Sequence, residues 1–282
     1  TVFVACALLI TLSSSNEAGW NSRPHVGQRG QIFVSTLDKT DSVTRSNTLM
    51  RSATQAVDAE RTVTSEATLR GMAWNSGPGG PETMVEAVSP ITGKTFTQLP
   101  DMAPMAELDV AYIVDDGTYL RQAGYLNEAD MVRALATLNA GGVLVPDPAL
   151  INGAGQVQLR SLDMADIAAA RAQGVSDSAL PDARVLRSQT FAASPLTRIN
   201  VMILSPAAAT ALRLNSVPLG QLLTVNKPVN TVDAPAFQAT IARQVPGASA
   251  QVITPTMRSI VLPYVAALIA IVAAAATVAL VV

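Results

Sequence analysis

The chain has 282 residues, of which 49% are hydrophobic and only 14% are charged, and its formal net charge is −2. An average soluble protein is about 25% charged, so this composition is typical of a protein with membrane-embedded parts. The balanced charge and the aromatic content of 4% exclude a basic, aromatic surface of the kind that binds nucleic acid, so no nucleic-acid partner is predicted.

The charged residues are confined to the middle of the chain, between Glu17 and Arg258. The apolar run TVFVACALLITL at residues 1–12 is shorter than the roughly 20 residues that span a bilayer. It has the length of a signal-peptide core, but no basic residues precede it. Its start also resembles a lipoprotein cleavage site at Cys6, although the apolar run continues past that cysteine. We interpret residues 1–21 as the C-terminal part of a first transmembrane helix, cut at its start, with a polar extension.

Strand and helix patterns alternate in the first half of the central segment. Ser46 or Asn47 is predicted to cap a helix that runs to about Ala59. A glycine- and proline-rich loop follows at 75–81, and a boundary between subdomains is predicted at 100–105. Strands are predicted at 31–35, 62–69, 83–88 and 110–114, and the apolar stripe of the helix consists of Met50, Ala53 and Val57.

The second half of the central segment continues the alternation. A turn at 115–117 leads into a short helix at 119–123, and Asn127 caps a helix that ends near Asn139. Residues 163–183 are polar and alanine-rich and favour no element. Strands are predicted at 143–145, 156–159, 200–204, 221–225 and 250–253, helices at 206–212 and from Asp233 to 246, and apolar stripes of Met131, Leu135 and Leu138 in one helix and Phe237 and Ile241 in another.

The chain ends in a second apolar segment, which runs from Ile260 to Val282 without a charged residue. This length is sufficient for a membrane-spanning helix. Pro263 falls in the first turn, where its missing N–H costs a helix little, and Tyr264 suits the membrane interface. A buried core helix is the alternative. We predict a second transmembrane helix at 259–282, also cut at its end.

The candidate catalytic and metal-binding residues do not form a complete site. His25 is the only histidine and Cys6 the only cysteine, so a triad with a histidine base and a zinc site both lack residues. Asp115 and Asp116, with Asp109 nearby, have the chemistry of a hard-metal site, but their spacing differs from that of a calcium loop. Aspartate is also common at turns that follow strands.

Two further patterns give no site either. Asp147 and Asp163 have no sequence relationship that pairs them, and the glycine-rich run at 77–80 lacks the Lys-Ser/Thr of a phosphate loop. The sequence therefore predicts no catalytic, cofactor-binding or metal-binding residues and no enzymatic activity. We expect the central domain to fold without a metal, a disulfide or a cofactor.

The order of these features resembles the FtsX-like permease family, the membrane subunits of MacB-type ABC transporters, in the form found in actinobacteria. Several phrases carry the resemblance, which covers nearly the whole chain. They are AYIVDD at 111–116 leading into YLRQAG at 119–124, AGGVLVPDP at 140–148, GQVQL at 155–159 and VMILSP at 201–206.

This resemblance implies an α+β extracytoplasmic domain of two subdomains, with mixed sheets and helices, flanked by transmembrane α-helices. Residues 22–105 and 200–258 would form a membrane-proximal α/β subdomain, and 106–199 a distal subdomain inserted into it. The β-α-β patterns at 31–69 and 200–253 would then share one sheet. We expect strand pairing between these two ranges; the alternative is two consecutive domains, each closed on itself.

The resemblance also implies a function and partners. The chain would be a permease fragment in the cell membrane, part of a multi-pass protein, with its central domain extracytoplasmic. A cytoplasmic ABC ATPase would hydrolyse ATP, and a second permease copy or half would complete the transporter. The external domain would couple that hydrolysis to work on a lipid, lipoprotein, peptide or cell-wall partner. The alternative is the ectodomain of a two-span membrane sensor or adhesion protein.

Overall fold

The computed structural model describes residues 27–36, 43–73, 83–93, 95–97, 110–124, 126–174, 185–195 and 201–253. Both predicted transmembrane segments, the loop at 75–81 and the boundary at 100–105 lie outside these residues. Among the helices of the described ranges, none has the length and apolar character needed to cross a bilayer. The central segment is a mixed α/β domain with one large mixed sheet, so the mixed strand and helix content predicted from the sequence is confirmed.

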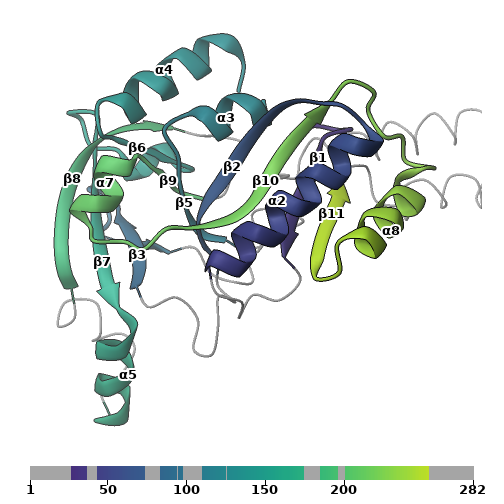
Figure 1. Ribbon diagram of the computed structural model, residues 1–282. Helices are drawn as coiled ribbons and strands as arrows, with labels where there is room; N and C mark the ends of the chain where they lie inside the picture. Colours follow the sequence, from purple (N-terminus) through teal and green to yellow (C-terminus); the bar gives the residue numbers. More distant parts are fainter. Residues whose placement is uncertain are drawn as a thin grey trace, which may run out of the picture.

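The sheet has eleven strands within the described residues, in the order β11-β1-β10-β2-β5-β9-β6-β8-β7-β3-β4 (Figure 1). The first four strands in space come from both ends of the chain. Their bounds are β11 Ala248–Val252, β1 Ile32–Thr36, β10 Val217–Val225 and β2 Val63–Ala73. Neighbouring strands in this group are antiparallel, and Ile32 lies opposite both Leu223 and Val252. The expected pairing of Ile32–Val34 with the strand near 251–253 is therefore confirmed.

Two β-α-β units interlock in this four-stranded group. Helix α2 (Val43–Glu60) connects β1 to β2, which are parallel and have β10 between them. Helix α8 (Ala234–Gln244) connects β10 to β11 in the same way around β1. This is the ferredoxin-like arrangement of two split β-α-β units. We call it the chain-end unit, because it contains the first and last described strands.

The two helices of the chain-end unit pack on the same face of its sheet. The predicted stripe of Met50, Ala53 and Val57 is buried there together with Ile241 of α8. Phe237 packs against the same cluster while remaining partly exposed. Neither β-α-β unit has enough apolar surface to cover a sheet alone, so sharing one sheet buries both stripes.

The remaining strands extend the sheet from β2 and form what we call the inserted unit. Its strands, in chain order, are β3 Thr83–Val88, β4 Thr95–Thr97, β5 Val110–Val114, β6 Val143–Val145, β7 Gln156–Asp163, β8 Val185–Pro195 and β9 Ile203–Leu204. Its helices are α3 Thr118–Ala123, α4 Glu128–Asn139, the 3₁₀ helix η2 Pro148–Leu150, α5 Met164–Ala172 and α7 Pro206–Ala211. Strands β3 and β4 come from the predicted range 22–105, and β3 pairs with both β4 and β7, so sheet contacts join the two predicted subdomains.

The two faces of the sheet are covered by different helices (Figure 1). Helices α3 and α4 pack over one face, where Phe33 and Leu69 of the chain-end unit share a core with Leu120 and Leu138. On the opposite face, α2 and α8 cover the chain-end unit, and α7 covers part of the inserted unit around Tyr112. The strand β2 passes between these two covered areas.

Several element predictions need correction. Helix α2 begins at Val43, so Ser46 and Asn47 lie in its first turns and do not cap it. A capping side chain contributes only about 1 kcal/mol, and burial of the apolar stripe decides where the helix runs. The buried stripe of α4 is Ala134 and Leu138, whereas the predicted Met131 and Leu135 are half-buried.

Strands in the inserted unit also differ from the prediction. The strand expected at 200–204 contains only Ile203 and Leu204, although Val201 and Met202 are fully buried. The sequence does not predict strand β8, because Ser188, Gln189 and Thr190 are all exposed and give no alternating apolar pattern. Backbone pairing with β7 and β6 holds this strand in place.

Candidate functional site

The aspartates considered as metal ligands start helices and turns. The Asp115 carboxylate accepts hydrogen bonds from the backbone N–H groups of Tyr119 (3.1 Å) and Leu120 (2.9 Å). Asp115 is only 6% exposed, and this burial raises the pKa of its carboxyl above the ordinary value. The Asp116 carboxylate accepts from Thr118, whose hydrogen bonds lower the pKa of Asp116. Both carboxylates are therefore engaged at the start of α3.

The other considered residues have equally local roles or are not described. Asp147 accepts a hydrogen bond from Ala149 N at the start of η2, and Asp163 accepts from Ala165 N at the start of α5. His25, Asp109 and the glycine-rich run at 77–80 lie outside the described residues. Within the described ranges, no three His, Cys, Asp or Glu residues come together as potential metal ligands.

The two ends of the described chain meet at one edge of the sheet. Gly30 N donates to Ile253 O at 2.8 Å, and Ile253 N donates to Gln31 O at 2.9 Å. The start of β1 and the end of β11 are thus hydrogen-bonded neighbours. A segment that enters the domain at 27 and one that leaves it at 253 therefore begin from the same place.

Two glutamines connect this chain-end edge to the inserted unit. Gln31 is 6% exposed, and its Oε1 accepts from Gln28 N at 2.6 Å. Its Nε2 donates to Gln122 O of α3 and to Thr224 Oγ1 of β10, both at 3.0 Å. The amide of Gln31 thus makes three hydrogen bonds in a largely dry environment, where leaving them unmade would be costly.

Gln122 completes the connection from the other side. Its Nε2 donates to Leu222 O of β10 at 2.7 Å and to Ser65 O of β2 at 3.2 Å. Hydrogen bonds with defined geometry therefore connect the chain at Gln28–Gln31 to α3. We call Gln31 and Gln122 the glutamine pair. No sequence pattern indicates it, because a single glutamine beside an apolar run is usually a surface residue.

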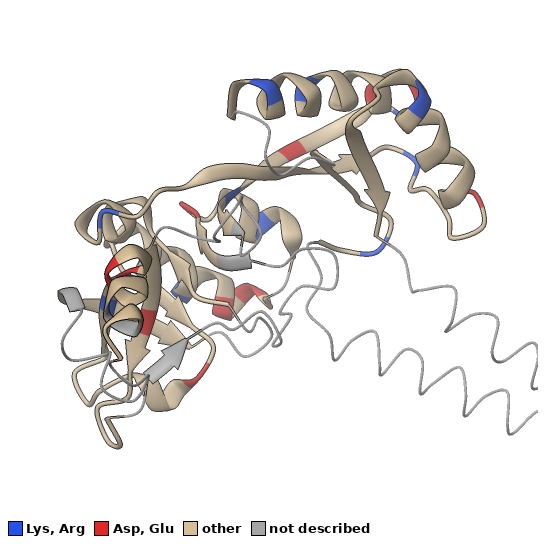
Figure 2. Ribbon diagram, turned by 90° about the horizontal axis from the view of Figure 1, so that it is seen from below, with Lys and Arg blue, Asp and Glu red and all other residues tan. Residues whose placement is uncertain are grey.

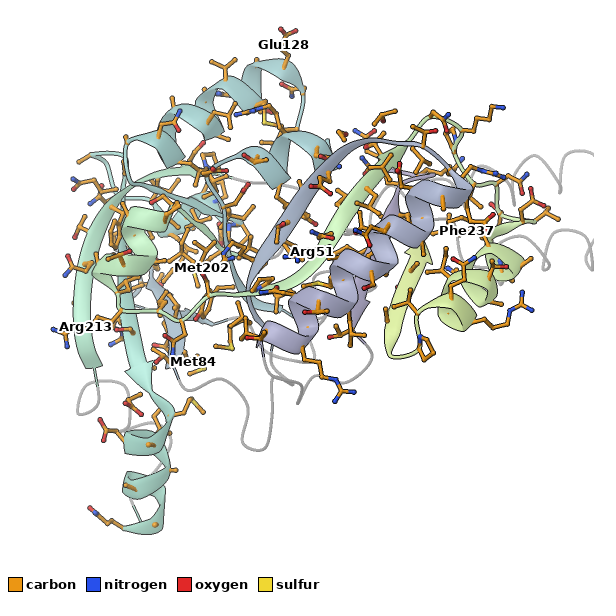
Figure 3. The ribbon with its side chains drawn as sticks, in the orientation of Figure 1. Arg51, Met84, Glu128, Met202, Arg213 and Phe237 are labelled. Atoms are coloured by element: carbon orange, nitrogen blue, oxygen red, sulfur yellow. The ribbon has the colours of Figure 1, made fainter. Side chains whose placement is uncertain are left out.

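A polar groove of about 340 Å³ lies between α2 and β2 on the opposite face of the chain-end unit. The groove exists because β2 turns a polar face toward the gap between the two helix-covered areas of the sheet. Figure 3 shows Arg51 of α2 beside the strands at this gap. The lining residues are Asn47, Met50, Arg51, Thr54, Glu66, Thr68, Arg70, Pro218 and Gln221.

Some of the polar groups in the groove are already used, and others are available. Thr54 Oγ1 donates to Gln221 Oε1 at 2.6 Å, and Arg70 donates to Ser216 O at 3.0 Å. The side chains of Arg51 and Glu66 form no hydrogen bond or ion pair with other described residues. The groove can therefore offer a cation, an anion and the hydroxyl group of Thr68 to an extended polar ligand.

Outside the groove, positively and negatively charged residues lie close to one another along the described elements. Figure 2 shows Lys and Arg interspersed with Asp and Glu along the ribbon, including along α2 and the region of α8. The elements in this view therefore carry no surface of a single charge sign that would attract an oppositely charged macromolecule over a long range. Comparison of the sequence with protein-family models and with curated proteins finds no match.

Proposed function

We propose that the chain is a permease fragment of an ABC transporter, with an external domain that couples cytoplasmic ATP hydrolysis to extracytoplasmic work. The observation that carries the proposal is that the two ends of the described domain meet at Gly30 and Ile253. A domain that hangs from two neighbouring membrane helices needs this geometry. The proposal also includes the flanking transmembrane helices, the extracytoplasmic location and the absence of enzymatic activity in the domain itself.

The glutamine pair supports a mechanical role. A movement of one membrane helix would pull on the start of β1, and Gln31 ties that point to α3 and β10. The inserted unit would then move together with the start of β1, because Gln31 links this start to α3. Work on a lipid, lipoprotein, peptide or cell-wall partner would be done at a distance from the membrane in this way.

The partners follow from the same proposal. An ABC ATPase would bind on the cytoplasmic side, and a second permease copy or half would complete the transporter. A direct test is to purify the full-length protein together with the ATPase encoded beside its gene. Co-purification, and ATP-dependent movement of a probe placed in the inserted unit, are expected. A full-length protein with a signalling module directly after 282 and no bound ATPase would contradict the proposal.

The groove favours a second candidate, the ectodomain of a two-span sensor or adhesion protein. Arg51 and Glu66 line a polar cavity and have no partner among the described residues, as expected for a ligand-binding surface. Substituting both with alanine would abolish ligand response in a sensor. The same substitutions would leave ATP-driven movement unchanged in a permease that does not use the groove.

A further inference from the structure

The loop between β10 and α8 lies at the same edge of the domain as the two chain ends. Strand β10 runs antiparallel to β1, so the end of β10 lies beside the start of β1. Contact between the loop and the chain start is close, because a Cβ built on Gly30 would lie 2.8 Å from the Cβ of Pro228. The loop therefore lies at the edge of the domain where Gly30 and Ile253 meet.

This loop displays an apolar side chain that the domain itself does not use. Val232 is 84% exposed, the highest value among the large hydrophobic residues of the described ranges. The loop is nevertheless ordered around it, because Val229 is buried in the core of the chain-end unit. Val232 is thus held out from the domain by a fixed turn.

Hydrogen bonds close the turn that carries Val232. Asn230 Nδ2 donates to Asp233 Oδ2 at 2.8 Å, and Asp233 N donates to Asn230 Oδ1 at 2.8 Å. The Asp233 carboxylate is therefore occupied by an amide partner. Lys227, earlier in the same loop, is exposed and has a long apolar stem with a cationic end, which suits the boundary between lipid chains and phosphate groups.

We propose that the loop 226–233 contacts the phospholipid surface, with Val232 entering the interfacial region and Lys227 lying among the phosphates. The proposal rests on the proposed function, because it requires the segments at 1–21 and 259–282 to lie in the bilayer. An extended chain covers about 3.5 Å per residue, so the stretch from Ile253 to Ile260 keeps this edge within about 25 Å of the second apolar segment. Because this short connection already holds the loop close to the lipid, one valine and one lysine are sufficient to maintain the contact.

A tryptophan scan with lipid-borne quenchers tests this contact in the full chain. Trp20 and Trp74 are first replaced with phenylalanine, and Val232→Trp is compared with Ile91→Trp. Ile91 is a matched control, since it is 83% exposed but follows β3 near the other end of the sheet. In vesicles of brominated phosphatidylcholine, we expect the Val232→Trp protein to lose fluorescence and the Ile91→Trp protein to keep it.

The outcomes separate this inference from the function on which it rests. Removal of the chain from the vesicles by a carbonate wash would overturn both. Retention of the chain with no quenching of the Val232→Trp protein would overturn the lipid contact alone. Shielding of the introduced indole from iodide without quenching by brominated lipid would also overturn it, and would indicate a protein partner for the loop instead.

Discussion

At one end of the sheet, β11, β1, β10 and β2 are packed against two helices with apolar stripes, α2 and α8. At the other end, β3 and β7 bury Val85 and Leu159 in a core that they share with the short helix α7. The helices α2 and α8 bury a continuous cluster that includes Ile32 and Leu223. By contrast, α5 projects beyond the end of β7 (Figure 1) and buries little more than Ile167 against Leu162. The helices α2 and α8 therefore cover the chain-end unit with a large apolar core, whereas α5 adds little core to the far end of the inserted unit.

The far end of the sheet contains a buried ion pair between two strands. Glu86 of β3 lies directly opposite Arg160 of β7, and Arg160 Nη2 is 3.2 Å from Glu86 Oε2. The side chains are only 8% and 11% exposed, respectively. Breaking such a pair is costly because the remaining charge stays buried.

The largest expected effect therefore comes from Glu86→Ala, which should lower the free energy of unfolding by about 3–5 kcal/mol. Urea denaturation of the full chain in detergent, followed by circular dichroism, measures the loss. The double variant Glu86→Leu/Arg160→Met should recover most of it, because an apolar pair needs no charge compensation. A surface control is Asp130→Ala, which removes the exposed pair of Asp130 with Arg133 and should cost far less. Equal losses in the two single variants would mean that the buried ion pair contributes no more to stability than the exposed one.

A second prediction concerns the pairing of β2 with β5, which joins the chain-end unit to the inserted unit. A methyl group at Gly71 of β2 would lie 2.1 Å from the carbonyl oxygen of Tyr112 in β5, and backbone cannot move aside easily. We expect Gly71→Ala to cost about 1–3 kcal/mol. Gly153→Ala is the matched control, since nothing lies within 4 Å of its Cβ position and its φ is not positive. That control should be neutral or slightly stabilising. Equal stability of the two variants would show that β2 and β5 are not closely paired.

A third prediction concerns the glutamine pair. Gln31→Ala and Gln122→Ala should each destabilise the domain by about 1–3 kcal/mol, because buried backbone groups lose their partners. Gln31 Nε2 donates to the backbone oxygen of Gln122, which the alanine variant keeps, so the two losses should be nearly additive in a double-mutant cycle. A Gln31→Ala variant as stable as the parent protein would mean that this side chain does not connect the chain-end edge to α3.

The smallest effect is the pH dependence of Asp115. Burial keeps the pKa of this carboxyl above 3.8, so the native protein still holds a proton at pH values where the unfolded chain has released it. The contribution of this group to stability therefore falls as the pH rises above about 4, by about 1.4 kcal/mol for each unit by which the pKa is raised. The Asp115→Asn variant should lack this fall. Parallel stability curves for the two proteins between pH 4 and 7 would contradict the prediction.

The chain-end unit was largely predictable from the sequence. Its helices have apolar residues one turn apart, and the requirement that Met50 and Ile241 both be buried led to the shared sheet. The capping role of Asn127 was also correct, because its side chain accepts a hydrogen bond from Asp130 N. At α8 the predicted Asp233 cap holds in position only, since its side chain bonds to Asn230 and not to the helix.

The far end and the candidate site were not predictable in the same way. The exposed strand β8 has no periodic pattern, and its place depends on partners such as Val157 and Leu159 opposite Phe191 and Gln189. Gln31, Gln122 and the groove residues Arg51 and Glu66 come together only through pairing of distant strands. Single polar residues give no signal until that pairing is known.

The central claim is that the domain returns both of its ends to one membrane, and the single cysteine allows a direct test. The full chain is inserted into sealed vesicles and treated with a membrane-impermeant maleimide. We expect Cys6 to react only after detergent is added, and so should the cysteine in a Cys6→Ser/Ala275→Cys variant, while a Cys6→Ser/Ile91→Cys variant reacts in intact vesicles. Rapid labelling of Cys6 or of the cysteine at 275 in intact vesicles would contradict the account.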